Sequence, residues 1–262
     1  MYRSIQSETK QMKAVQVMAT HFGTRRHYPF NTQGVIDLIT RQIEHHKFLD
    51  LGYPTDLLIV NHDIELEEVR DFLDQYEGTT LLNGVVRILR RPFFEPDLSF
   101  ASYKYAFTKF QDKYDYWYFN EDDVIIKHQY LMKDMIDLLE SDPALGFIAT
   151  SNFVNYNMHL FTYDEDGYVI KTGADEPHAH GGCGLTSTGI FLDICDKFPD
   201  FMNTANIRHE TTGNHIEREH PGGYMEGYRE IDFSHRFIQA GYKMKCISTG
   251  NSFERLQDGG LI

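Results

Sequence analysis

Short apolar runs alternate with amphipathic segments along the first half of the chain. Residues 14–20 (AVQVMAT), 57–60 (LLIV), 85–89 and 116–119 (YWYF) are typical of strands buried on both faces. Between these runs, apolar residues recur at helical spacing and predict three helices: Val35, Ile36, Ile39 and Ile43; Leu66, Val69, Leu73 and Tyr76; Phe100, Tyr103, Phe107 and Phe110. Strands separated by helices in this way predict right-handed βαβ units and a mostly parallel sheet flanked by helices.

The second half of the chain is more irregular. A helix around Leu131, Met135 and Leu138 precedes a strand at 146–150, and the sequence DEDG predicts a turn between strands at 159–163 and 168–172. Further along, the apolar segment 189–192 predicts a strand, residues 199–228 a long loop, and residues 232–240 and 243–248 a last helix and strand. With no repeat or low-complexity linker, we expect one α/β domain over residues 1–262, with a looped second half.

Composition and charge narrow the classes of protein. Thirty-nine acidic against 25 basic residues give a net charge of −14, which argues against a nucleic-acid partner. The chain lacks a run of about 18 apolar residues, so no transmembrane segment is expected. A polar start without an apolar signal region, and cysteines without a CxxC pair, predict a cytoplasmic protein with reduced thiols.

Three carboxylates follow directly after the fourth predicted strand. Glu121, Asp122 and Asp123 come after YWYF, and ligands of open parallel sheets bind beyond the carboxyl ends of the strands. Adjacent carboxylates repel one another unless a cation compensates, and their oxygens suit Mg²⁺ or Mn²⁺. In an extended segment residues i and i+2 point the same way, so Glu121 and Asp123 are expected to face one ion. A solvated acidic turn or a helix cap is the alternative.

A second carboxylate pair, Glu230 and Asp232, precedes the last predicted helix. A helix N-terminus favours negative charge, which by itself accounts for Asp232 better than for Glu230. A carboxylate beside a substrate hydroxyl is also able to act as a general base.

The order of these features resembles a GT-A glycosyltransferase, closest to the inverting family-two type. The similarity runs from the first strand (VQVMATHFG) through YWYFNEDD, at the place of the DxD motif, to REIDFSHRFIQAGYKMKCIS, which resembles the "EDxDxxxR…GY" element. The resemblance implies a GT-A fold in which residues from about 12 to 125 bind a nucleotide and those from about 126 to 262 bind an acceptor.

For the nucleotide, the resemblance implies residues that follow the first three strands. Thr20 matches a position that contacts the base, and Asn61 stands where an acidic residue usually recognises the uracil or ribose, with Asp63 two residues later. Arg90 or Arg91 is expected to touch the nucleotide. UDP is the family's usual nucleotide, while GDP and dTDP remain open.

For the chemistry, the resemblance implies a divalent cation and a carboxylate base. Asp123 matches the metal-binding second Asp of DxD, and Glu121 replaces the first. Glu230 matches the base of inverting members, but Arg229 replaces the preceding acid, so the base is Glu230, Asp232 or a residue elsewhere. The cation, Mn²⁺ or Mg²⁺, would stabilise the diphosphate leaving group while the base deprotonates an acceptor hydroxyl.

The acceptor side is expected to be lined by the Gly-rich segment HAHGGCGLTSTG, where small residues allow close approach. Gly181 and Gly182 belong to it, and His180 and His220 are candidates for contacting a sugar. The acceptor itself is a glycan, a lipid-linked saccharide or a protein.

Two other classes of function stay open. The chain is either a carbohydrate- or nucleotide-binding protein of the same fold with impaired catalysis, or a metallohydrolase that binds zinc through some of its histidines (His178, His180, His209, His215 and His220). A nucleotidyltransferase would also use a parallel sheet and Mg²⁺, but THFGTRRHYP after the first strand is not a Gly-rich phosphate loop.

Overall fold

A computed structural model describes most of the chain. It covers residues 12–21, 32–62, 67–92, 99–150, 161–163, 169–171, 179–199, 201–202, 233–234, 236–247 and 253–255.

The core of the fold is a seven-stranded sheet with the order β10-β6-β9-β4-β1-β2-β3. Its strands are β1 Ala14–His21, β2 Thr55–His62, β3 Val86–Arg91, β4 Tyr116–Glu121, β6 Leu145–Ala149, β9 Gly184–Ser187 and β10 Lys243–Cys246. All neighbours are parallel except β9, which runs antiparallel to both β4 and β6. The expected α/β class with a mostly parallel sheet is confirmed.

Two small antiparallel pairs lie outside this sheet. The predicted hairpin is present as β7 Phe161–Tyr163 and β8 Val169–Lys171. The other pair joins β5 Val124–Ile126 to β11 Phe253–Arg255. Sequence patterns gave no sign of this second pair, which brings the C-terminal segment beside the acidic residues that precede Val124.

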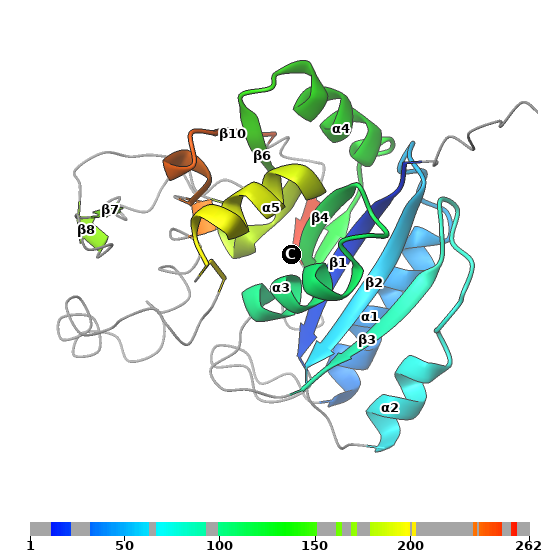
Figure 1. The fold of residues 1–262 in the computed structure, drawn as a ribbon. Coiled ribbons are helices and arrows are strands. Elements are labelled where there is room, and N and C mark those ends of the chain that lie inside the picture. Colours follow the sequence, from blue (N-terminus) through cyan, green and yellow to red (C-terminus); the bar gives the residue numbers. More distant parts are fainter. Residues whose placement is uncertain are drawn as a thin grey trace, which may run out of the picture.

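Helices cover both faces of the sheet (Figure 1), with α3 and α5 on the near face and α1 behind it. The helices are α1 Thr32–His46, α2 Glu67–Asp74, α3 Ser99–Phe110, α4 Leu131–Ser141 and α5 Thr188–Lys197, and a 3₁₀ turn, η1, spans His180–Gly182. Alternation along β1 sends Val15 and Val17 toward α3 and Met18 toward α1. The helices predicted in the first half are therefore confirmed, and so is the helix around Met135.

One predicted strand is wrong. Residues 189–192 lie in helix α5, and the strand at this place is β9, which ends two residues earlier at Ser187. Ser187 caps the helix by accepting a hydrogen bond from the backbone nitrogen of Ile190 at 3.3 Å. Phe191 and Ile194 are buried at helical spacing while Leu192 is exposed. A short apolar run does not distinguish a strand from a helix, and here the cap and the spacing decide for the helix.

Aromatic side chains fill the core between β4, α3 and α5. Phe107 lies 4.9 Å from Trp117 and 4.3 Å from Phe191, measured between ring centroids. Phe233 belongs to the last helical segment, described at residues 233–234 and 236–239, and lies 5.3 Å from Phe100 and 6.5 Å from Phe119. Buried aromatic rings contribute large apolar areas and prefer such tilted contacts. This core therefore joins residues more than a hundred positions apart behind the carboxyl end of β4.

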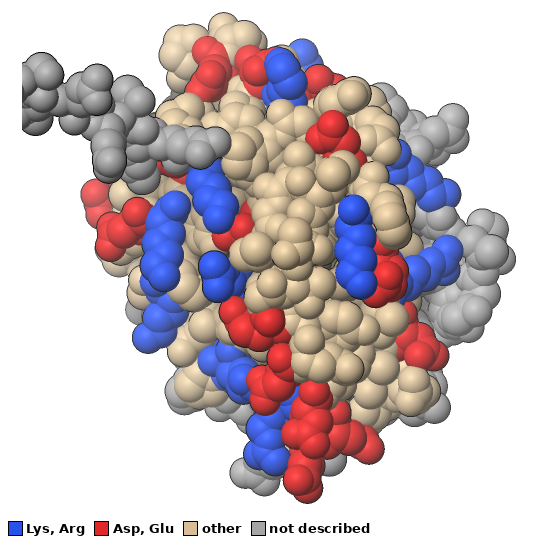
Figure 2. All heavy atoms as spheres, turned by 90° about the vertical axis from the view of Figure 1, so that its right-hand side faces the viewer, with Lys and Arg blue, Asp and Glu red and all other residues tan. Residues whose placement is uncertain are grey.

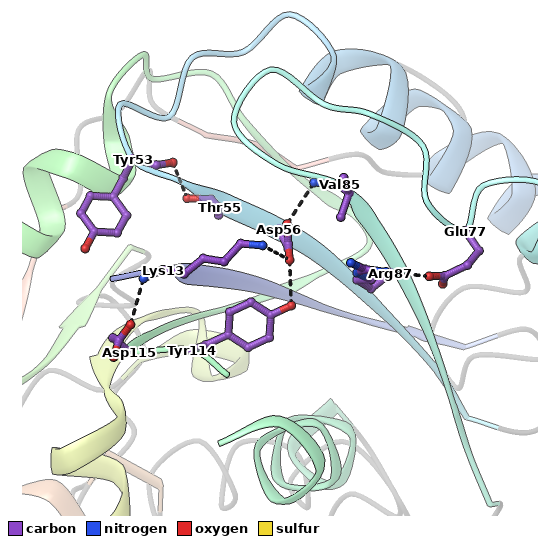
Figure 3. Close-up of polar contacts among 9 residues, drawn as sticks. All are labelled: Lys13, Tyr53, Thr55, Asp56, Glu77, Val85, Arg87, Tyr114 and Asp115. Atoms are coloured by element: carbon purple, nitrogen blue, oxygen red, sulfur yellow. Dashed lines mark hydrogen bonds and ion pairs between the residues drawn. The ribbon is translucent and has the colours of Figure 1, made fainter. Parts of the chain in front are cut away.

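At the opposite end of the sheet, a buried carboxylate joins the beginnings of several strands (Figure 3). Asp56, 1% exposed, accepts hydrogen bonds from Lys13 Nζ at 2.6 Å, Tyr114 OH at 2.9 Å and the backbone nitrogen of Val85 at 3.0 Å. The backbone nitrogen of Lys13 donates to Asp115 Oδ2 at 2.9 Å. Burial, and then the charge of Asp56, raise the pKa of Tyr114, so its hydroxyl stays a donor. Asp56 thus fixes where β1, β2, β3 and β4 start relative to one another.

The surface at the β3 edge of the sheet carries both charges. Figure 2 shows basic and acidic side chains interspersed on this face, with acidic ones gathered at its lower end, where α2 lies. Among the described residues, none of the helices is both long and apolar enough to cross a bilayer.

We expect Asp56→Ala to lower the free energy of unfolding by about 3 kcal/mol, because it leaves a buried hydroxyl and a backbone N–H without their acceptor. Urea denaturation monitored by tryptophan fluorescence measures the change. Asp137→Ala is the matched control. It removes the carboxylate of an exposed ion pair with Lys133 and should cost less than about 1 kcal/mol. Equal losses in the two variants would contradict the role assigned to Asp56.

Candidate functional site

Polar side chains gather where the parallel strands end. The strand register places Thr20 opposite Asn61, Ala19 opposite Glu121, and His62 opposite Arg91, so these residues share one edge of the sheet. Thr20, Asn61 and Arg91 are 2%, 4% and 4% exposed, respectively. Open parallel sheets bind their ligands beyond the carboxyl ends of the strands, so this row of buried polar side chains marks the candidate site.

The three carboxylates lie at the same edge but do not point the same way. Glu121 ends β4, whereas Asp122 and Asp123 form a turn into β5. Glu121 accepts a hydrogen bond from Ser99 Oγ at 3.0 Å, on the α3 side of the sheet. Asp122 accepts from Thr20 Oγ1 at 2.9 Å. The expectation that residues 121 and 123 face one ion assumed an extended chain, and the turn removes that assumption.

The two aspartates of this turn are deeply buried. Asp122 is 0% and Asp123 7% exposed, while Glu121 is partly exposed. Within the described parts of the chain, no three His, Cys, Asp or Glu side chains come close enough together to hold a metal ion. A site for Mg²⁺ or Mn²⁺ here would use one or two carboxylates and complete its shell with water and phosphate oxygens, as these ions commonly do.

Two glycines of η1 pack directly against the acidic residues and the aromatic core. Gly181 and Gly182 have φ angles of +59° and +65°. A Cβ on Gly181 would lie 2.8 Å from Glu121 Oε2, and one on Gly182 would lie 2.5 Å from a ring carbon of Phe100. Both positions therefore favour glycine for the backbone conformation, and a side chain at Gly181 would also have to displace the Glu121 carboxylate. Whether they also contact an acceptor sugar remains a prediction.

Two buried tyrosines of this region, Tyr103 and Tyr118, form hydrogen bonds through neutral hydroxyl groups. Tyr103 OH donates to the carbonyl oxygen of Gly181 at 3.3 Å. Burial raises the pKa of Tyr103 well above its usual value, and the nearby Cys183 and Glu121 raise it further. Burial also raises the pKa of Tyr118, whose hydroxyl lies 3.3 Å from Thr150 Oγ1. Both phenols stay protonated and serve as hydrogen-bonding groups.

The two candidate arginines differ in their surroundings. Arg90 is exposed, and its Nη2 lies 2.5 Å from Asp74 Oδ1, which directs it toward α2. Arg91, the next residue, is 4% exposed. In the register Arg90 is opposite Asn61 and Arg91 is opposite His62, so the two arginines lie on opposite faces of β3.

Several predicted residues lie outside the described part of the chain, namely Asp63, His220, Glu230 and Asp232, and so does the side chain of His180. Phe233, which follows Asp232 in sequence, is described in the aromatic core. Its neighbour Ser234 accepts a hydrogen bond through Oγ from the backbone nitrogen of Ala179 at 2.9 Å. Ser234 thus attaches the last helical segment to the chain just before η1.

Sequence reasoning missed the residues that hold the acidic turn from behind. Gln42 and His45 of α1, and Asn120 of β4, hydrogen-bond to backbone carbonyls of the turn and of β5. A signal was available, because Gln42 interrupts the apolar stripe formed by Ile39 and Ile43.

Comparisons with known proteins give a likeness of fold alone. No family model matches the chain, and no curated protein matches its sequence. Among solved structures, the 4-diphosphocytidyl-2C-methyl-D-erythritol synthase of Anaerococcus prevotii is 11% identical, with a TM-score of 0.48, and the match covers 95% of this chain and 94% of that one. CMP:2-keto-3-deoxy-manno-octonic acid synthetase, complexed with CTP, is 10% identical, with a TM-score of 0.49 and 90% of each chain covered. TarS of S. aureus is 10% identical, with a TM-score of 0.48, over 94% of this chain and 37% of that one.

We expect Gly181→Ala to lower the free energy of unfolding by about 1–2 kcal/mol more than Gly78→Ala does. Urea denaturation measures both changes. Gly78 has a similar φ of +78°, but no atom lies within 4 Å of the place that a Cβ would take there, so its substitution measures backbone strain alone. The excess cost should disappear when both substitutions are repeated in a Glu121→Ala background. An excess that persists there would mean that Glu121 is not what the new methyl group meets.

Proposed function

We propose that this protein is a metal-dependent glycosyltransferase, which moves a sugar from a nucleotide-sugar donor to a hydroxyl acceptor. The observation that carries the proposal is the hydrogen bond between Thr20 and Asp122. It ties the acidic turn after β4 to the end of β1, at the edge where open parallel sheets bind their ligands.

The oxygen donors of the turn fit a hard divalent cation, Mn²⁺ or Mg²⁺. Asp123 would be a direct ligand, with Glu121 or Asp122 as the second carboxylate. Gly181 leaves room beside the Glu121 carboxylate that any side chain would fill. When bound, the cation would supply charge stabilisation for the departing diphosphate. A chain of net charge −14 has particular need of such a cation to bind a phosphorylated ligand.

The nucleotide would lie along the ends of β1, β2 and β3. Thr20 is opposite Asn61 in the register, and Asn61 is opposite Arg90 on the next strand, so these three would line one side of a base and ribose. Arg91 would approach the nucleotide from the other face of β3. A UDP-sugar is the favoured donor, with GDP- and dTDP-sugars as the other options.

The acceptor would approach from the side of η1 and the last helical segment. Glu230 or Asp232 would take the proton from the acceptor hydroxyl during direct displacement, which inverts the anomeric carbon. Phe233 supports this location, because it follows Asp232 directly and lies in the core beside Phe119, two residues before Glu121. Gly181, Gly182, His180 and His220 are the candidates for contacts with a glycan or lipid-linked saccharide.

We expect UDP with Mn²⁺ to raise the melting temperature by roughly 5 °C at saturating concentration, and neither alone to do so. Asp123→Asn should abolish this shift, because it removes a charged oxygen ligand while keeping the side chain's shape. Thermal shift assays with UDP, GDP, dTDP and CTP, each with and without Mn²⁺, make the measurement. Asp134→Asn, an exposed acid on α4, is the matched control and should behave as the wild type.

A nucleotide shift that does not need the cation, or that survives Asp123→Asn, would contradict the metal site and favour a binding protein of the same fold. Loss of stability on chelation, with stoichiometric zinc in the purified protein, would instead favour the metallohydrolase.

We expect Glu230→Gln to leave the Mn²⁺-dependent nucleotide shift unchanged while cutting sugar transfer by about 100-fold or more. The amide keeps the size of the side chain but cannot accept the acceptor's proton. Asp232→Asn is tested in the same way. For each protein, the rate of sugar transfer is measured as release of the nucleoside diphosphate from the nucleotide sugar whose nucleotide gave the largest thermal shift. If both variants turn over at the wild-type rate, the base lies elsewhere in the chain.

A further inference from the structure

The acidic turn is held from behind by one side chain of helix α1. Gln42 Nε2 donates to the carbonyl oxygen of Asp122 at 3.1 Å and to that of Val124 at 2.6 Å. These two carbonyls flank Asp123 on either side, so a single amide group fixes the backbone of Asp123 at both ends.

The neighbouring contacts fix the rest of the segment in the same way. Asn120 Nδ2 donates to the same Val124 carbonyl at 2.9 Å and closes the turn. His45, also on α1, lies with its Nε2 2.6 Å from the carbonyl oxygen of Ile126. Helix α1 therefore holds both the acidic turn and β5 through hydrogen bonds to their backbone carbonyls.

This arrangement is not the one that stability alone would favour. Gln42 is 0% exposed, and its Oε1 meets no hydrogen-bond donor among the described residues. A buried amide with one unsatisfied end costs free energy, which its two hydrogen bonds to the turn offset only in part. The turn itself buries two consecutive aspartates, Asp122 and Asp123. An amide that tethers both carbonyls opposes the opening of the turn.

We propose that Gln42 is a positioning residue for the cation site, and that it acts by holding the Asp122–Val124 backbone so that Asp123 keeps its place. This inference rests on the proposed function, since it concerns the same carboxylates. Gln42 itself touches neither cation nor substrate in this scheme.

The chain offers a matched control in Gln16. It is also a fully buried glutamine with one unpartnered amide atom among the described residues, and it too forms a hydrogen bond, with His46 Nε2 at 2.8 Å. It lies on β1 at the level of Tyr118, away from the turn. Replacing either glutamine by Met removes similar interactions from a similar environment, but only one replacement releases the turn.

The test is a titration of each purified full-length protein with Mn²⁺ alone and with Mn²⁺ plus UDP, in which the EPR signal of free hydrated Mn²⁺ reports binding. We expect Gln42→Met to weaken Mn²⁺ binding at least ten-fold and Gln16→Met to leave it unchanged. Both Met variants should lower the urea midpoint, so a loss of Mn²⁺ binding confined to the Gln42 variant is a result that a merely structural role would not give. Gln42→Asn, whose amide is one methylene too short to bridge both carbonyls, should show the same weakened binding and serves if the Met variant does not fold.

The outcomes separate the two proposals. Wild-type affinity in the Gln42 variants, with binding abolished by Asp123→Asn, would overturn the positioning role and leave the proposed function standing. Equal weakening in the Gln42 and Gln16 variants would also overturn it, because the effect would then be a general loosening of the core. If the wild type binds no Mn²⁺ with or without UDP, the proposed function and this inference both fail.

Discussion

The candidate site depends on keeping two adjacent aspartates buried at the end of β4. Asp122 and Asp123 repel each other, and burial deprives them of the water that would screen them. Neutral donors on other elements hold this turn in place. The Thr20 hydroxyl donates a hydrogen bond to the Asp122 carboxylate, and the Gln42 amide donates to backbone carbonyls on both sides of Asp123. Their placement at the carboxyl end of β4 is the feature on which the proposed cation site rests.

The sheet and the aromatic core determine where that turn lies. Asp56 aligns the starts of β1, β2, β3 and β4 at one end of the sheet. The carboxyl ends of these strands, with their polar residues, therefore lie at a common level at the other end. The aromatic core then brings Phe233 against Phe100 and Phe119, which attaches the last helical segment to the chain beneath Glu121. Rigid elements thus position both halves of the proposed site, and the glycines of η1 allow them to approach closely. Catalytic groups gain from such preorganisation, because little reordering is needed when substrate binds.

Much of the fold could be predicted because its signals are local. The buried parallel strands read as apolar runs, and α1, α2 and α3 show helical spacing over several turns. The error at residues 189–192 came from a run too short to carry a period, where the Ser187 cap was the better guide. The β5–β11 pair was missed for another reason: three-residue strands far apart in sequence carry almost no pattern of their own.

By itself, the sequence determined the α/β class, the carboxylates after the fourth strand and the polar residues that end the first three strands, since each depends on residues close together in the chain. Only the tertiary structure decided how those carboxylates are oriented. It turned Glu121 toward Ser99 and Asp122 toward Thr20, distinguished buried Arg91 from exposed Arg90, and placed Gln42 behind the turn. These are contacts between residues up to 102 positions apart. They follow from how the helices pack on the sheet, which no local spacing encodes.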